Sequence, residues 1–138
     1  MNQIKLISTV LVVFLFFDSF YLWGFGAAKR VYIPMHKKIQ KGKVTIRYIG
    51  AIVAYALLAL GIYYFVLREG KEKNKQKVAL NGALFGLVSY GIYNSTNYAL
   101  LKRYGLSVAF QDTIWGIVVS SSVGVISLVT FNHFVNNL

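Results

Sequence analysis

The sequence predicts an all-α integral membrane protein, a four-helix bundle with both termini on the same side of the membrane. Hydrophobic residues make up 57% of the 138 positions and charged residues only 14%, whereas soluble domains carry about 25% charged residues. Most of the charge lies between long apolar stretches. Four of these stretches have the length of about 20 residues that a helix needs to cross a bilayer core of about 30 Å.

The four expected spans form a single transmembrane domain that occupies residues 1–138. They cover roughly residues 4–28, 48–67, 78–101 and 106–131. A secretory signal peptide is the alternative for the first span, since Lys5 precedes its apolar run. A signal peptide's apolar region has about 7 to 15 residues, and this run is longer and contains Asp18. We therefore expect a retained span and a multi-pass membrane protein.

The basic residues predict the orientation. With four spans, nine Lys and Arg fall on the connections 29–47 and 102–103, and six on the side of the termini. The positive-inside rule then places these two connections in the cytoplasm. Several aromatic residues fall near span ends, as interfacial aromatic belts do. They are Tyr21, Trp23, Tyr32, Tyr48, Tyr63, Tyr64, Tyr98 and Tyr104.

The connection 29–47 mixes seven cations with apolar residues, a pattern that suits a segment lying on anionic lipid headgroups. We expect its lysines at the membrane surface, with membrane lipids as partners; a solvated loop is the alternative. These lysines are Lys37, Lys38, Lys41 and Lys43. We expect no nucleic-acid partner, because the positive charge is divided between two membrane faces rather than gathered on one surface.

The composition also narrows the chemistry. The chain has no cysteine, which excludes disulfides, thiolate metal sites and cysteine nucleophiles. Its two histidines, His36 and His133, are too few for a zinc site or a bis-histidine haem. We therefore expect neither a metal nor a cofactor.

Two carboxylates inside the expected spans need an explanation, because an ionised carboxylate in a bilayer costs at least about 2.5 to 3.5 kcal/mol. Asn94 precedes the short turn between the last two spans, and Asp112 follows it by a similar number of residues. We therefore expect both about 9 to 12 Å below the membrane surface, because a helix rises 1.5 Å per residue. Asp18 lies about 15 Å from the expected end of the first span, on the same side. We therefore expect the three side chains to face the bundle interior in one half of the membrane.

Small residues recur every four positions along the last two spans. Gly82, Gly86, Tyr90 and Asn94 form one row, and Asp112, Gly116, Ser120 and Gly124 form the other. Small-xxx-small rows let helices approach closely in lipid. If the rows face each other, the same contact brings Asp112 and Asn94 inward. The rows also suit a contact between two copies of the chain, so a homo-oligomer stays open.

The stretch from residue 81 to 116 resembles the predicted bacterial-type membrane proteins grouped as domain-of-unknown-function family 2177. The resemblance covers a glycine-rich third span, a short turn and the opening of the fourth span. The matching residues are Tyr93, Thr96, Asn97, Ala99, Leu101, Asp112, Trp115 and Gly116. Asp18 fits an acidic position of the family's first span, where Tyr21 replaces an expected Trp. Asn94 replaces an Asp, which leaves two intramembrane carboxylates instead of three. The resemblance implies a fold and no established activity.

We interpret the protein as a non-enzymatic module that binds a lipid or a partner through an intramembrane polar pocket. A proton-coupled or cation pathway through Asp18 and Asp112 is the first alternative, and an intramembrane lipid-modifying enzyme using them as acid and base is the second. The candidate binding or proton-exchange residues are Asp18, Tyr93, Asn94, Thr96, Asn97, Asp112 and Trp115.

Overall fold

The computed structural model describes residues 3–68 and 74–136, and every element in that part of the chain is a helix. The prediction of an all-α protein is therefore confirmed. Three elements are π-helical (η), and η1 and η3 continue the α-helices before them without a break in the helical backbone. In chain order the elements are α1 (Gln3–Ser19), η1 (Phe20–Gly24), η2 (Ala28–Tyr32), α2 (Ile33–Gln40), α3 (Tyr48–Gly61), η3 (Ile62–Leu67), α4 (Lys75–Leu100) and α5 (Leu106–Asn136).

Three helices in the described ranges are long and apolar enough to cross a membrane. They are Gln3–Gly24, Tyr48–Leu67 and Leu106–His133. The third expected span, residues 78–101, is not among them, although α4 has 26 residues. Asn81, Asn94 and Asn97 lower the mean hydropathy of α4. The expected four apolar spans are therefore three, together with one long helix of mixed polarity.

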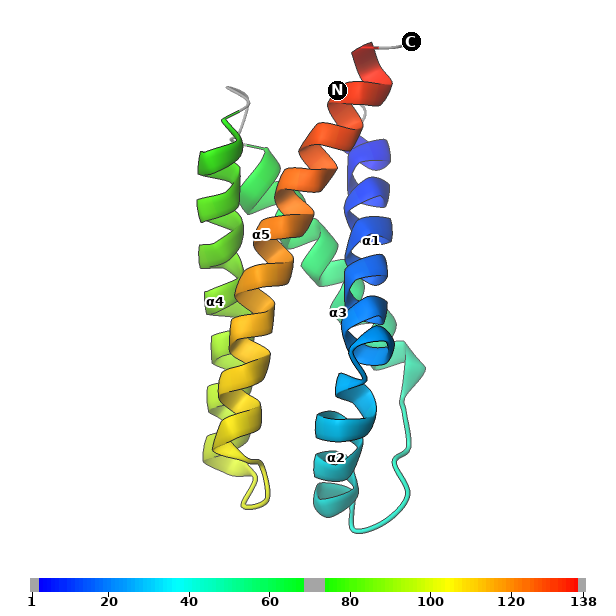
Figure 1. Ribbon diagram of the computed structural model, residues 1–138, viewed down its shortest axis with the longest axis vertical. Coiled ribbons are helices and arrows are strands. Elements are labelled where there is room, and N and C mark those ends of the chain that lie inside the picture. Colours follow the sequence, from blue (N-terminus) through cyan, green and yellow to red (C-terminus); the bar gives the residue numbers. More distant parts are fainter. Residues whose placement is uncertain (1–2, 69–73, 137–138) are drawn as a thin grey trace.

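The helices α4 and α5 lie side by side as a hairpin, and α1 runs along the other side of α5 (Figure 1). The contact between α4 and α5 is backbone to backbone. A Cβ atom built on Gly86 would lie 2.1 Å from the Gly116 carbonyl oxygen, and one on Gly82 would lie 2.7 Å from that of Ser120. The two rows of small residues thus face each other, and they bring the helix axes close together. Asn74 is the N-cap of α4, since its side chain accepts a hydrogen bond from the Gln76 N–H at 2.9 Å.

One end of the molecule is filled by a tightly packed apolar core. It is built where η3 crosses between α1, α4 and α5, and we call it the far end. Its fully buried side chains include Val10 and Phe14 of α1, Ile62 and Val66 of η3, and Val123 of α5. Gly124 belongs to this region, since its position faces Val66 and Val78. Packing contacts of this kind hold helices together in lipid, where water expulsion contributes little.

The opposite end holds α2 and the turn between α4 and α5, and we call it the α2 end (Figure 1). The first long helix stops at Gly24 rather than at the expected residue 28. The break occurs at Gly26, which has φ +72°, a left-handed conformation that glycine adopts without a steric penalty. Asp18 consequently lies six residues from the helix end, or about 9 Å at 1.5 Å per residue, and not the expected 15 Å.

The basic connection contains a short helix that packs on the α4–α5 turn. Pro34 stands in the first turn of α2, which continues η2 without a break in the helical backbone; its missing N–H leaves one carbonyl of the preceding turn without a helical partner. Met35 is buried in a small cluster with Tyr104 and Ala109. Lys37, Lys38, Lys41 and Lys43 are all exposed. Met35 and, in part, Tyr32 and Ile39 thus pack against protein, whereas the lysines stay accessible.

Candidate functional site

Asp18 links three helices through hydrogen bonds from uncharged donors. Its Oδ1 accepts from the Trp115 indole Nε1 of α5 at 2.8 Å, and its Oδ2 accepts from the Tyr55 hydroxyl of α3. Asp18 itself lies near the end of α1, just before the π-helical segment η1. The carboxylate therefore joins α1, α3 and α5 at one point.

Asp112 is held by a second set of uncharged donors. Its Oδ1 accepts from the Tyr32 hydroxyl at 2.5 Å, and its Oδ2 accepts from the Asn94 amide at 2.8 Å. Asn94 is 1% exposed; its amide also donates to the Tyr90 carbonyl at 2.9 Å, and its own oxygen accepts from the Tyr104 hydroxyl at 2.5 Å. This network ties η2, α4, α5 and the α4–α5 turn together.

Aromatic stacking positions the Trp115 donor. The Tyr21 ring of η1 stacks on the Trp115 ring with centroids 4.0 Å apart and planes 10° from parallel. Gln111 Nε2 donates to the Tyr21 hydroxyl at 2.9 Å. The wider π-helical turn shifts the direction of the side chains that follow Asp18, and Tyr21 reaches α5 from this segment. The stack thus fixes the indole N–H toward Asp18.

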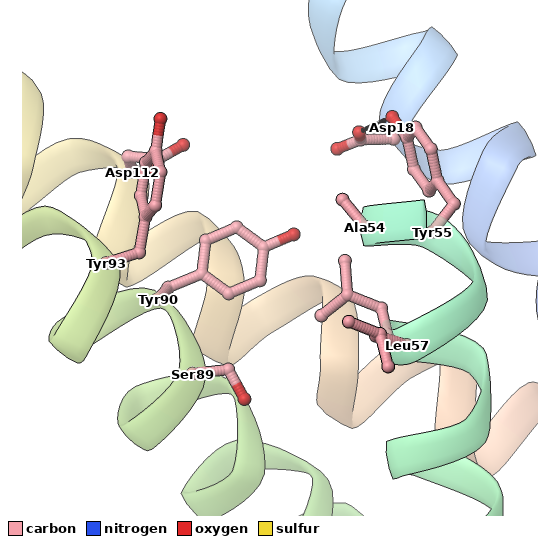
Figure 2. A pocket seen from close by; sticks show the side chains of 9 residues that line it. Asp18, Ala54, Tyr55, Leu57, Ser89, Tyr90, Tyr93 and Asp112 are labelled. Atoms are coloured by element: carbon pink, nitrogen blue, oxygen red, sulfur yellow. Dashed lines mark hydrogen bonds between the residues drawn. The ribbon is translucent and has the colours of Figure 1, made fainter. Parts of the chain in front are cut away.

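Both carboxylates line one cavity of about 400 Å³. Figure 2 shows Asp18 and Tyr55 on one side, Asp112 and Tyr93 on the other, and the Tyr90 hydroxyl pointing into the space between them. Most of the remaining wall is apolar. The other lining residues are Ala54, Leu57, Leu58 and Ser89.

The cavity lies where α3 and α4 diverge. Figure 1 shows α3 crossing obliquely behind the other helices, and α4 makes its contacts with the η3 segment that follows α3. At the rim of the cavity, Leu57 is 62% exposed and Tyr93 is 54% exposed. The opening between α3 and α4 therefore faces sideways, toward the surface that lipid would cover.

The phenols of Tyr32 and Tyr104, which belong to the Asp112 network, keep their protons. Burial and then the Asp112 carboxylate raise the pKa of Tyr32 far above its ordinary value, and burial raises that of Tyr104. Both hydroxyls therefore act as donors at every physiological pH. Tyr32 donates to Asp112 directly, whereas Tyr104 donates to Asn94, which in turn donates to Asp112; none of these donors brings a positive charge.

The sequence-predicted candidates divide into three groups. Asp18, Tyr93 and Asp112 line the cavity, and Asn94 and Trp115 stand behind the two carboxylates as donors. The remaining two do not line it. Thr96 is exposed, and Asn97 is only partly buried, one turn beyond Asn94.

Sequence reasoning missed the phenols that solvate the carboxylates. Tyr32 and Tyr104 were assigned to aromatic belts near span ends, whereas their hydroxyls bind Asp112 and Asn94. Tyr55 was not singled out, although it donates to Asp18. A useful signal existed for Tyr55, since a tyrosine seven residues inside an uncharged span requires a polar partner for its hydroxyl.

The comparisons with known proteins identify the family. A family model described as a predicted membrane protein, DUF2177, matches residues 3–129. The chain belongs to this family. The family expected from residues 81–116 is thus confirmed, and the protein is a membrane protein. The match includes every residue that lines the cavity of this DUF2177 protein. No curated protein and no solved structure matches the chain.

Proposed function

We propose that this DUF2177 protein is a membrane-embedded binding module whose cavity accepts a small amphiphile with a cationic or hydrogen-bond-donating head. One observation carries the proposal: two carboxylates stand on opposite walls of a single, mostly apolar cavity. An amine placed between them would find a carboxylate on each side. Its apolar portion would contact Leu57 and Leu58.

The size of the cavity supports a small ligand. Ligand pockets commonly have volumes of about 300 to 1,000 Å³, and this cavity of about 400 Å³ lies at the lower end of that range. It suits a head group with part of one chain rather than a whole phospholipid. The sideways opening between Leu57 and Tyr93 would let the rest of the chain stay among the lipid tails.

The proposal includes a fourth membrane crossing by α4. Two observations support it: α4 is paired with the apolar span in α5, and its most buried amide, Asn94, faces α5 rather than lipid. Four crossings would form a four-helix bundle with the termini on one side of the membrane. The start of α1 and the end of α5 lie at the far end of the molecule, in agreement with that topology (Figure 1).

A titration with matched amphiphiles tests the binding function. Trp23→Phe leaves Trp115, which donates to Asp18, as the chain's single tryptophan and thus as a fluorescent reporter. The protein is placed in phosphatidylcholine nanodiscs and titrated with dodecylamine or dodecanol. We expect half-saturation by the amine at a mole fraction at least about tenfold lower, since a hydrogen bond to a charged group contributes about 1.5 to 3 kcal/mol.

Variants complete this test. Asp112→Asn should weaken amine binding about tenfold and leave the binding of dodecanol unchanged, because Asn lacks the charge that the amine requires. Thr96→Val is the matched control, since Thr96 is exposed and does not line the cavity. Equal binding of amine and alcohol, or equal effects of the two variants, would refute the proposal.

The alternatives have weaker support. A proton or cation path from the cavity to the far end would have to cross the packed layer around Phe14, Ile62 and Val66, all of which are fully buried. For an enzyme, the cavity's serine would be the natural nucleophile, yet the Ser89 hydroxyl donates to the Phe85 carbonyl at 2.8 Å. Because the packed layer blocks a proton path, liposomes containing the protein should show the same proton flux as empty liposomes.

A further inference from the structure

A second cavity, of about 330 Å³, lies at the α2 end between α2 and the start of α5. Three cations line it: Arg30 before α2, Lys38 in α2, and Arg103 in the turn before α5. Ser107 and Gln111 add polar groups from the first turns of α5. This cavity shares no lining residue with the one that contains Asp18 and Asp112.

The three cations lack carboxylate partners among the described residues. Asp18 and Asp112 are the only carboxylates in the described ranges, and their hydrogen bonds come from Trp115, Tyr55, Tyr32 and Asn94. The guanidinium groups are held by backbone carbonyls instead. Arg103 donates to the Lys38 carbonyl at 3.1 Å, and Arg30 donates to that of Phe25. The three positive charges around this cavity thus have no neighbouring carboxylate among the described residues.

The backbone at the start of α5 adds partial positive charge next to the cavity. The cavity includes Gly105 and Ser107, at the first turn of the 31-residue helix α5. The first N–H groups of a helix have no partner within the helix, and its dipole places partial positive charge there. Helix N-termini of this kind bind phosphate groups. The side chains and the helix end therefore favour the same type of ligand, an anion with several acceptor oxygens.

The surroundings indicate where that anion comes from. Val31, Pro34 and Val108 form an apolar part of the wall. Leu106 and Phe110, which adjoin lining residues in the sequence of α5, are 63% and 70% exposed. Exposed apolar side chains next to several cations are typical of a membrane interface. A phosphate attached to acyl chains would contact both the cations and the apolar residues, whereas free phosphate would contact only the cations.

We propose that the cavity between Arg30, Lys38 and Arg103 is a specific site for the phosphate of an anionic lipid headgroup. The guanidinium of Arg103 and the ammonium of Lys38 bind the phosphate oxygens from two sides, and the start of α5 provides backbone donors. This site differs from the surface expected from the sequence, because Lys37, Lys41 and Lys43 do not line the cavity.

Matched charge variants test the proposal with the full-length protein in a neutral detergent. The ligands are dihexanoyl phosphatidic acid, dihexanoyl phosphatidylcholine and inorganic phosphate, and binding is measured by microscale thermophoresis at fixed ionic strength. Lys38→Gln combined with Arg103→Gln removes two charges from the cavity. Lys37→Gln combined with Lys41→Gln removes two charges from the same segment outside it. We expect the first pair to weaken binding of phosphatidic acid at least tenfold, and the second less than twofold.

Equal losses in the two double variants would overturn the site and indicate diffuse attraction to the basic segment. Binding of inorganic phosphate as tight as that of phosphatidic acid would overturn the lipid assignment. Lys38→Gln alone guards against misfolding, because the contact with Arg103 uses the backbone carbonyl of Lys38 and not its side chain. This single variant should still bind phosphatidic acid at least threefold more weakly than the wild type.

Discussion

The two carboxylates of the described residues, partly buried Asp18 and buried Asp112, accept hydrogen bonds from uncharged side chains. An ionised carboxylate costs at least about 2.5 to 3.5 kcal/mol in a bilayer, and a hydrogen bond to a charged group returns about 1.5 to 3 kcal/mol. Two such bonds to Asp18 and two to Asp112 therefore offset the cost without an ion pair. No cationic side chain of the described residues pairs with either carboxylate, so under the proposed function a cationic ligand would provide the counter-charge.

Loss of one such donor should destabilise the fold. Trp115→Phe removes the indole N–H that donates to Asp18 but keeps a ring to stack on Tyr21. We expect the free energy of unfolding to fall by about 1 to 3 kcal/mol, measured by SDS titration in mixed micelles. Trp23→Phe is the control, because Trp23 is 64% exposed. If both variants unfold at the same SDS fraction, the Asp18 bond contributes nothing measurable.

At the scale of the elements, the α4–α5 hairpin depends on the absence of side chains at two positions. Gly86 faces the Gly116 carbonyl and Gly82 faces that of Ser120. A side chain added at either glycine would collide with these backbone carbonyls, which cannot move aside as a flexible side chain would. The hairpin in turn sets the distance between Asn94 and Asp112, so helix packing and the site are coupled.

A pair of glycine variants tests this coupling. Gly86→Ala should lower the free energy of unfolding by about 1 to 3 kcal/mol through overpacking, and it should separate Asn94 from Asp112. Gly91→Ala, in the same helix, meets only the Thr113 methyl at 4.0 Å and should change stability by less than about 1 kcal/mol. SDS titration measures both variants. Equal stability of the two would mean that the close approach at Gly86 is unimportant.

Periodicity predicted the hairpin well, because a four-residue repeat fixes one face of a helix whatever lies around it. The rows that contain Gly86 and Gly116 could therefore be placed opposite each other from the sequence. The phenols that donate to the carboxylates could not be assigned in this way. Tyr32 meets Asp112 only because the first long helix breaks near Gly26, before the segment that leads into α2, and Tyr55 lies 37 residues from Asp18. Tertiary contacts of this range leave no local pattern.

At the scale of the whole molecule, the α2 end carries more positive charge than the far end, whose interior is densely apolar. The α2 end carries the segment 29–47 and Lys102 with Arg103. The positive-inside rule places such an end in the cytoplasm. Arg68, which follows η3, and Asn74, which precedes α4, are then expected on the opposite side.

Cysteine labelling tests this orientation directly, since the chain has no native cysteine. Gly42→Cys and Lys102→Cys lie at the α2 end and should react with an impermeant maleimide only after the cells are opened. Asn74→Cys lies at the start of α4 and should react in intact cells. Labelling of Gly42→Cys in intact cells would reverse the orientation. Labelling of Lys102→Cys and Asn74→Cys from one side would show that α4 does not cross.

The sideways opening of the cavity between α3 and α4 affects how a ligand would arrive. A molecule that enters past Leu57 and Tyr93 comes by diffusion within the plane of the bilayer and never has to leave the hydrocarbon. Site occupancy would then follow the abundance of the amphiphile in a single leaflet, in mole per cent, rather than its dissolved concentration. A compound almost insoluble in water could thus fill the site readily, whereas a soluble analogue without a tail would stay unbound.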